Sequence, residues 1–142
     1  MKDILVPISP GELLDKITIL RIKTQRMTDA AKLANVRHEL ELLEKTWSES
    51  ARQAGIDVSA EERALEAVNT RLWVIEDDIR DKEAHRQFDA RFVELARSVY
   101  IENDERAAIK KRINQKLGSK IVEEKSYKDY RHPPGQPPGS GS

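Results

Sequence analysis

Apolar residues recur every three or four positions over most of this 142-residue chain, and the spacing predicts α-helices. The first helix is expected from Pro10 to about Met27. It follows the sequence Ser9-Pro10-Gly11-Glu12, in which Ser9 caps the helix, Pro10 fits its first position and Glu12 reaches back to the cap. The apolar positions of this helix cover a wide face, which indicates contacts on two sides.

Three longer helices are expected after it, each spanning roughly 40 Å at 1.5 Å per residue. The second follows a cap at Thr28 or Asp29 and ends near Gly55, a glycine suited to a left-handed helix end. The third begins at a second capping box made by Ser59 and Glu62. The fourth restarts around 87–89 and continues to residue 117, with a glycine at 118.

Heptad-like seams on the second and third helices suggest how they pair. The second helix carries Leu33, Val36, Leu40, Leu43 and Trp47. The third carries Leu65, Val68, Leu72, Ile75 and Ile79. We therefore expect these two helices to pack antiparallel. Because the seams are narrow, a homodimer that completes the bundle is also expected.

Both ends of the chain differ from this helical pattern. Residues 3–8 (DILVPI) are apolar and β-branched, which predicts a short strand or an extended arm. Residues 131–142 are rich in Pro, Gly and Ser and are expected to be disordered or foreign to the natural protein. The prediction is an all-α fold with one domain over residues 1–130: a four-helix antiparallel bundle of long helical hairpins with a short N-terminal extended arm.

The last helix carries charged residues inside its own apolar stripe. At three-four spacing, the stripe reads Phe92, Leu95, Val99, Glu102, Arg106, Ile109 and Ile113. A buried charge is costly unless it is paired. Glu102 and Arg106 are therefore expected to clamp each other, to meet partners on neighbouring helices, or to line a site.

Composition excludes several classes of function. Lys plus Arg (25) equals Asp plus Glu (25), so no bulk charge draws the chain to nucleic acid. Cysteine is absent, which excludes disulfides and thiolate chemistry. No stretch is long and apolar enough for a signal sequence or a membrane span, and we expect a cytoplasmic protein.

A second polar stripe runs along the fourth helix and is a candidate anion pocket. Arginine and lysine side chains alternate there with tyrosine and asparagine side chains, whose hydrogen bonds could orient a bound anion. Polar residues of the third helix could face them. The candidate ligand-binding residues are Arg97, Tyr100, Asn103, Arg106, Lys110, Glu76, Arg80 and Glu102. The alternative for this stripe is an interface or a ladder of salt bridges within the helix.

The acidic stretch around Glu76 and Asp77 raises the question of a metal site. Clustered carboxylates suit a divalent cation, and a metal-dependent phosphohydrolase through Glu76, Asp77 and Glu102 stays open. The duplicated Glu-x-x-His of a di-iron bundle is missing, however. A solvated face or structural ion pairs are preferred, so no metal and no cofactor are predicted.

Three stretches resemble a family of small bacterial proteins, the domain-of-unknown-function family DUF6165. They are VPISPGELLDKITILRIK with KLANVRHEL, then LWVIEDDIRD, and finally FVELARSVYIENDERAAIKKRIN followed by GSKIVEEKSY. The likeness covers about residues 4–130. It implies no established activity and a loose association with surface-polysaccharide synthesis. Family-like polar positions include Glu12, Asp15, Asn69, Trp73, Glu76, Asp77, Arg80, Asn103, Arg106 and Lys110.

Two function hypotheses follow. The first is a non-enzymatic interaction or accessory module that binds a protein partner or itself. The second is a small-molecule-binding protein or enzyme with a polar pocket between the first, third and fourth helices. This pocket would hold an anionic phosphate, carboxylate or nucleotide-sugar ligand, by architectural analogy with helical chorismate mutases.

Overall fold

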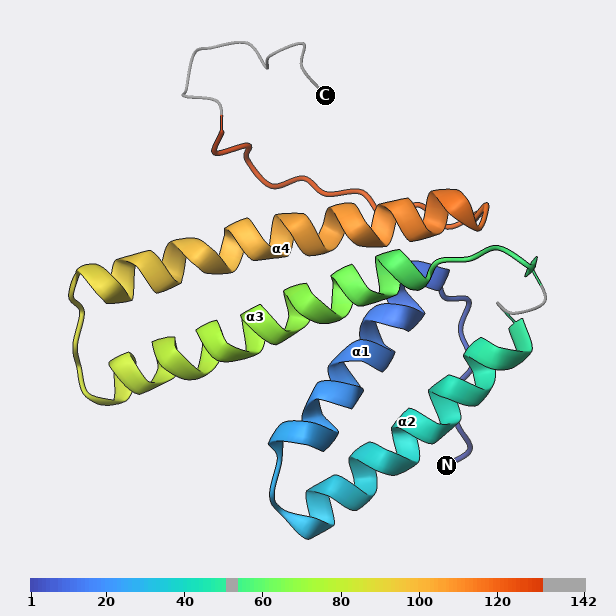
Figure 1. Ribbon diagram of the computed structural model, residues 1–142, viewed down its shortest axis with the longest axis horizontal. Coiled ribbons are helices and arrows are strands. Elements are labelled where there is room, and N and C mark those ends of the chain that lie inside the picture. The colour runs from blue at the N-terminus through green and yellow to red at the C-terminus, as the bar shows by residue number, and fades with distance from the viewer. Residues whose placement is uncertain (51–53, 132–142) are drawn as a thin grey trace.

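The computed structural model describes residues 1–50 and 54–131, and this part of the chain is all-α (Figure 1). Its four helices are α1 (Pro10–Arg26), α2 (Ala30–Ser50), α3 (Ser59–Ala84) and α4 (Ala90–Lys116). The predicted fold class is confirmed. The tail predicted from residue 131 lies almost wholly outside the described residues.

The helices form two antiparallel hairpins that cross at an angle, α1 with α2 and α3 with α4 (Figure 1). Helix α1 contacts each of the other three helices, whereas α2 contacts α1 alone among the described helices. The predicted pairing of the second and third helices is therefore wrong. The reason is that α1, with its wide apolar face, contacts both of these helices, and α3 pairs with α4 instead of α2.

The core lies where α1 crosses the α3–α4 hairpin. Its buried members come from α1, α3, α4 and the residue before α3: Leu13, Leu14, Ile17, Val58, Leu65, Val68, Ile109 and Ile113. No residue of α2 is buried, and its seam only packs against the edge of this core through Leu40, Leu43 and Trp47. Helix α2 is thus the least anchored of the four.

The caps predicted for the first and second helices are confirmed, and Asp89 caps the fourth helix. The side chains of Ser9, Asp29 and Asp89 each accept a hydrogen bond from the backbone N–H three residues later, at 3.3, 2.9 and 2.9 Å. The glycines expected past helix ends, Gly55 and Gly118, have φ angles of 66° and 65°, in the left-handed region. These local signals explain why the helix bounds were predictable.

The second predicted capping box is wrong. Ser59 is the first residue of α3 and not its cap, because Asp57 accepts from the Ser59 N–H at 2.9 Å. Glu62 points its carboxylate at Arg21 of α1, at 2.6 Å from Nη1. A long-range ion pair therefore takes the glutamate that the sequence pattern assigned to the helix start.

The start of α1 lies directly against the end of α4. Asn114 accepts a hydrogen bond from the Gly11 N–H at 2.7 Å, so a side chain of α4 satisfies a free amide of α1. A Cβ at position 11 would lie 2.6 Å from the backbone oxygen of Lys110. Only glycine permits this close approach, and it brings the polar residues of both helices together.

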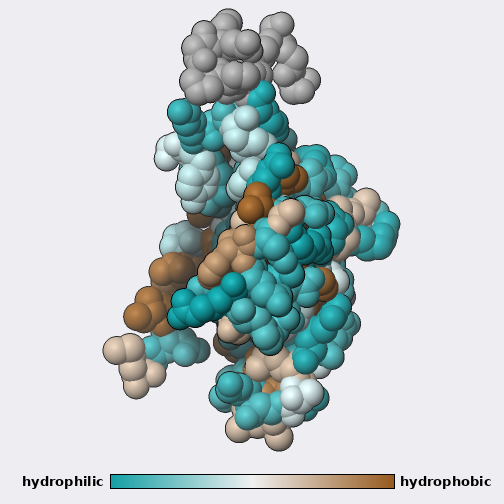
Figure 2. Space-filling view, turned by 90° about the vertical axis from the view of Figure 1, so that its left-hand side faces the viewer, coloured by the Kyte–Doolittle hydropathy of each residue, from teal (hydrophilic) through white to brown (hydrophobic). Residues whose placement is uncertain are grey.

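Residues 1–8 have no regular structure and form the predicted extended arm. Its apolar side chains are strongly exposed: 77% for Ile4, 92% for Leu5 and 69% for Val6. Figure 2 shows apolar residues projecting from a largely hydrophilic face. Within the described residues, no helix is long and apolar enough to cross a membrane.

Candidate functional site

A buried carboxylate lies at the junction of α1, α3 and α4. Asp15 of α1 is only 1% exposed and accepts two hydrogen bonds from Arg106 of α4, one from Nε at 2.8 Å and one from Nη2. Asn69 of α3 donates to the same carboxylate at 2.9 Å. Three helices are therefore joined by one charged group and its partners.

The electrostatics of this junction favour the ionised carboxylate. Burial by itself would raise the pKa of Asp15, but hydrogen bonds from Arg106 and Asn69 and the charges of Arg106 and Lys110 outweigh burial. The pKa of Asp15 is therefore lower than its usual value. Asp15 raises the pKa of Arg106 in turn, so both groups remain charged.

Lys110, one turn further along α4, is also paired. Its Nζ lies 2.6 Å from Glu12 Oε2, 3.8 Å from Asp15 Oδ2 and 3.7 Å from Glu123 Oε2. Glu12 thus faces α4 and does not turn back to its own N-cap. Of the predicted anion-binding cations, Arg106 and Lys110 already have carboxylate partners within the chain.

The sequence did not identify Asp15 as the buried carboxylate that joins the helices, although its position on α1 points to burial. Asp15 lies on the face of α1 that also holds Gly11, Thr18 and Ile22, at helical spacing, and all four are buried. An aspartate on a buried face requires a cationic partner, and Arg106 in the apolar stripe of α4 is the matching charge. The interpretation that Glu102 and Arg106 meet partners on neighbouring helices holds, because Glu102 Oε2 lies 3.0 Å from Arg71 Nε of α3.

Beside this junction is a groove between α1, α3 and α4 with a volume of about 410 Å³. Four of the predicted site residues line it: Glu76, Arg80, Asn103 and Arg106. The remaining wall is formed by Ile19, Ile22, Asn69, Leu72, Trp73 and Asp77. The predicted pocket between the first, third and fourth helices therefore has a counterpart in the structure, which we call the α1–α3–α4 groove.

Asn69 and Trp73 give this groove its most directional features. The Asn69 side chain donates both amide hydrogens inward, to Asp15 and to Thr18, each at 2.9 Å. Its orientation is therefore fixed, and the carbonyl oxygen is the group left to accept a hydrogen bond. Trp73 is half-buried and adds an aromatic wall one turn further along α3.

The other predicted site residues lie elsewhere. Arg97 is exposed on α4, and Glu102 is paired with Arg71. Tyr100 packs edge to face against Tyr130 of the C-terminal segment, with ring centroids 4.8 Å apart. Together with Lys110, these residues do not line the groove. The polar stripe of α4 thus serves several separate contacts.

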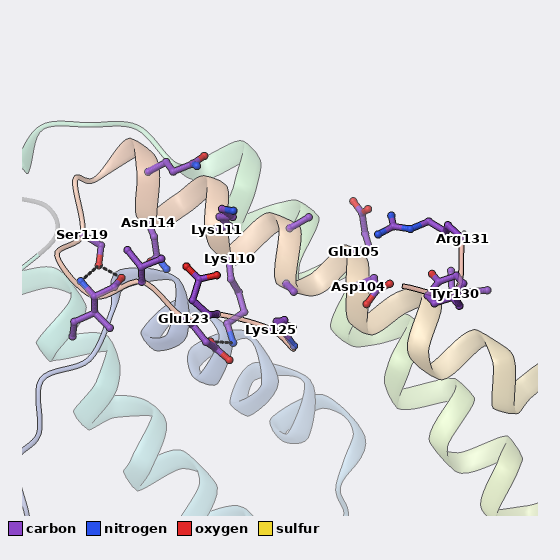
Figure 3. A pocket seen from close by; sticks show the side chains of 17 residues that line it. Asp104, Glu105, Lys110, Lys111, Asn114, Ser119, Glu123, Lys125, Tyr130 and Arg131 are labelled. Atoms are coloured by element: carbon purple, nitrogen blue, oxygen red, sulfur yellow. Dashed lines mark hydrogen bonds and ion pairs between the residues drawn. The ribbon is translucent and has the colours of Figure 1, made fainter. Parts of the chain in front are cut away.

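A second cavity, of about 650 Å³, lies on the outer face of α4 (Figure 3). The extended segment 119–131 runs back along α4 and forms its far wall (Figure 1). Asn114 and Ser119 lie at one end of the cavity and Tyr130 and Arg131 at the other, and the ion pair of Lys110 with Glu123 lies between them. Acidic and basic side chains alternate around it, so it has no dominant charge.

No three histidine or acidic side chains in the described ranges are placed to hold a metal ion. Glu76 and Asp77 line the groove, but Glu102 lies outside it and pairs with Arg71. Near the end of α3, His85 Nδ1 lies 3.5 Å from the Asp81 carboxylate. Within this acidic stretch of α3, Glu76 pairs with Arg80 one turn along the helix.

These observations define an all-α protein of two crossed hairpins, with a buried ion-pair junction and a polar groove beside it. The chain belongs to the family of unknown function DUF6165, whose model matches residues 4–140. This confirms the resemblance and extends it beyond residue 130. Neither the curated proteins nor the solved structures contain a match.

Proposed function

We propose that this protein is a non-enzymatic binding module whose α1–α3–α4 groove holds a polar group of its ligand. One observation supports this proposal above the others. The groove combines apolar walls, an aromatic side chain and a few fixed polar groups, a combination typical of binding sites. These groups come from three helices whose arrangement is fixed by Asp15 and its partners.

Binding is favoured over catalysis because two of the three carboxylates at or beside the groove, Asp15 and Glu76, have basic partners. Asp15 is held by Arg106, and Glu76 Oε2 lies 3.3 Å from Arg80 Nε. A general base needs a proton-accepting group aimed at the reacting atom. Carboxylates held in ion pairs serve better to orient a bound ligand.

We also propose that the protein forms a homodimer, and the specific observation is the state of α2. This helix has no buried residue and packs on α1 alone among the described helices. Its half-exposed seam would be covered by the same seam of a second copy. A role in the bacterial cytoplasm as an accessory to surface-polysaccharide synthesis belongs to the same proposal and depends on the family resemblance.

The dimer has a direct test. Sedimentation equilibrium of the full chain should give twice the monomer mass. Replacing Leu33 and Val36 of the α2 seam by Glu should return the protein to a monomer with unchanged helix content. A wild-type protein that sediments as a monomer up to about 100 μM would contradict this part of the proposal.

The groove is tested by NMR spectroscopy of the ¹⁵N-labelled full chain. The two tryptophans, Trp47 on α2 and Trp73 in the groove, give two indole N–H signals, which the Trp47→Phe variant assigns. A panel of small cationic, anionic and neutral polyhydroxy compounds is added one at a time. A compound that shifts the Trp73 signal and leaves Trp47 in place supports binding in the groove. If none of the compounds shifts Trp73, the proposed function is wrong.

A further inference from the structure

We propose that the α1–α3–α4 groove accepts an organic cation, a guanidinium or ammonium group on a short carbon chain. The inference rests on the proposed function, because it requires the groove to be a binding site. It goes further by assigning the chemical class of the ligand, and it differs from the anion expected from the sequence.

The first argument is the charge left in the groove after its internal pairs are counted. Two carboxylates, Glu76 and Asp77, and two guanidinium groups, Arg80 and Arg106, line it. Arg106 is already neutralised by Asp15, which is buried behind it. The positive charge of Arg106 is therefore balanced inside the protein. The remaining charged groups of the groove, Glu76, Asp77 and Arg80, carry a net negative charge.

The second argument is the hydrogen-bonding character of the deepest polar group. Asn69 is only 5% exposed, and both of its amide hydrogens are donated inward. Within the described part of the chain, no group donates to its carbonyl oxygen, and this side chain lines the groove. The groove therefore offers an acceptor, which calls for a ligand that donates N–H hydrogen bonds.

The third argument is the aromatic wall. Trp73 lies one helical turn from both Asn69 and Glu76 on α3, so the indole, the carbonyl oxygen and the carboxylate line the same groove. A cation over an indole ring is attracted by the ring, and tryptophan is the strongest of the aromatic partners. An acceptor, a carboxylate and an indole together are complementary to an organic cation.

Arg80 provides a cation of the expected kind within the protein itself. Its side chain is 81% exposed, yet its Nε lies 3.3 Å from Glu76 Oε2 at the groove. An exposed pair of this kind is weak and is readily displaced. Arg80 therefore competes with a cationic ligand for Glu76. Removing Arg80 should tighten the binding of a cation, whereas it should weaken the binding of an anion.

The probes are agmatine and the capped peptide acetyl-Gly-Arg-Gly-amide. Agmatine is a small amine with a guanidinium group at its other end, and the peptide carries the same guanidinium group on a peptide backbone. Succinate and inorganic phosphate serve as anionic probes, and 1-butanol serves as a neutral one. Each is titrated into the ¹⁵N-labelled full chain at low and high salt, and the Trp73 indole signal gives the affinity. The same titrations are run on Arg80→Gln, Glu76→Gln and Asp78→Asn.

For the cationic probes, we expect Arg80→Gln to tighten binding about two- to fivefold, because a competing cation is removed. Glu76→Gln should weaken binding about fivefold or more. Asp78→Asn removes the same charge from α3 at a position outside the groove and should change affinity less than about twofold. Binding of agmatine alone points to a free amine, whereas binding of the peptide as well points to a protein partner.

The opposite pattern overturns the inference. If succinate or phosphate shifts Trp73 and Arg80→Gln weakens that binding, the groove is an anion site, and the proposed binding function survives. If a cationic probe binds with equal affinity to wild type, Arg80→Gln and Glu76→Gln, the assigned contacts are wrong. If no probe shifts Trp73, both the inference and the groove as a binding site are refuted.

Discussion

Replacing Asp15 by Asn tests whether one carboxylate holds the three helices together. The substitution keeps the size of the side chain but removes its charge. Its carbonyl oxygen can still accept from Arg106 Nε and Asn69, but its NH₂ group then faces the Nη2 donor of Arg106. Arg106 is left with a partly buried, unpaired charge, since its side chain is 29% exposed. Asn69 also keeps Thr18 as an acceptor.

The cost follows from the partners that are lost. Breaking a buried ion pair on one side costs about 3–5 kcal/mol, and the partial exposure of Arg106 reduces this to roughly 2–3 kcal/mol. For a chain of this length, about 3 °C per kcal/mol gives a fall in Tm of roughly 6–9 °C. Glu76→Gln, which breaks an exposed pair within α3, is the control and should cost less than about 0.5 kcal/mol.

The assay is urea unfolding followed by far-ultraviolet circular dichroism, on a double-mutant cycle. Arg106→Met removes the other charge, and the double variant Asp15→Asn/Arg106→Met leaves neither charge unpaired. We expect the double variant to recover about 1–2 kcal/mol relative to the sum of the single variants. A loss below about 1 kcal/mol for Asp15→Asn, or single losses that simply add, would refute the central role of this pair.

Three further predictions concern pH, packing and the uneven core. Because the pKa of Asp15 is lowered on folding, the ionised carboxylate stabilises the folded protein above about pH 4, and this stabilisation is lost as the pH falls through the folded pKa. Urea midpoints of wild type and Asp15→Asn are measured from pH 3 to 7. They should differ by a constant amount above pH 5 and converge at the acid end. Gly11→Ala should lower the stability by about 2 kcal/mol in thermal unfolding, despite the better helix propensity of alanine, because its Cβ would meet the Lys110 carbonyl oxygen at 2.6 Å. Leu65→Ala should cost about 3–4 kcal/mol and Leu40→Ala only about 1 kcal/mol, since Leu65 is fully buried and Leu40 lies at the core edge; equal losses would show that α2 is anchored as firmly as α3.

The extents of the helices were predictable because their ends are set by neighbouring residues. Ser9, Asp29 and Asp89 each cap the helix that follows them, and Gly118 ends α4. The arrangement of the helices was less accessible. A heptad seam shows that a helix has a partner but does not identify it: α2 packs on α1, whereas α3 packs on both α1 and α4.

The polar stripe of α4 divides between separate places for a related reason. Asn103 and Arg106 line the groove, whereas Tyr100 and Lys110 contact other segments. A stripe along one helix gives no information about which neighbour each residue meets. The partner of Asp15 was not identified from the sequence, because Arg106 lies 91 positions away and only the crossing of the hairpins brings them together.

The contact between Gly11 and Asn114 joins positions 103 residues apart and bears on the order of folding. Both hairpins are closed by short loops, so the contacts within each are local. Helix α1 must wait, because its buried face is completed only when the far end of α4 exists. During synthesis from the N-terminus, the helix with the most buried apolar side chains is therefore made first and covered last. In this interval α2, its hairpin partner, is the only described helix available to shield it.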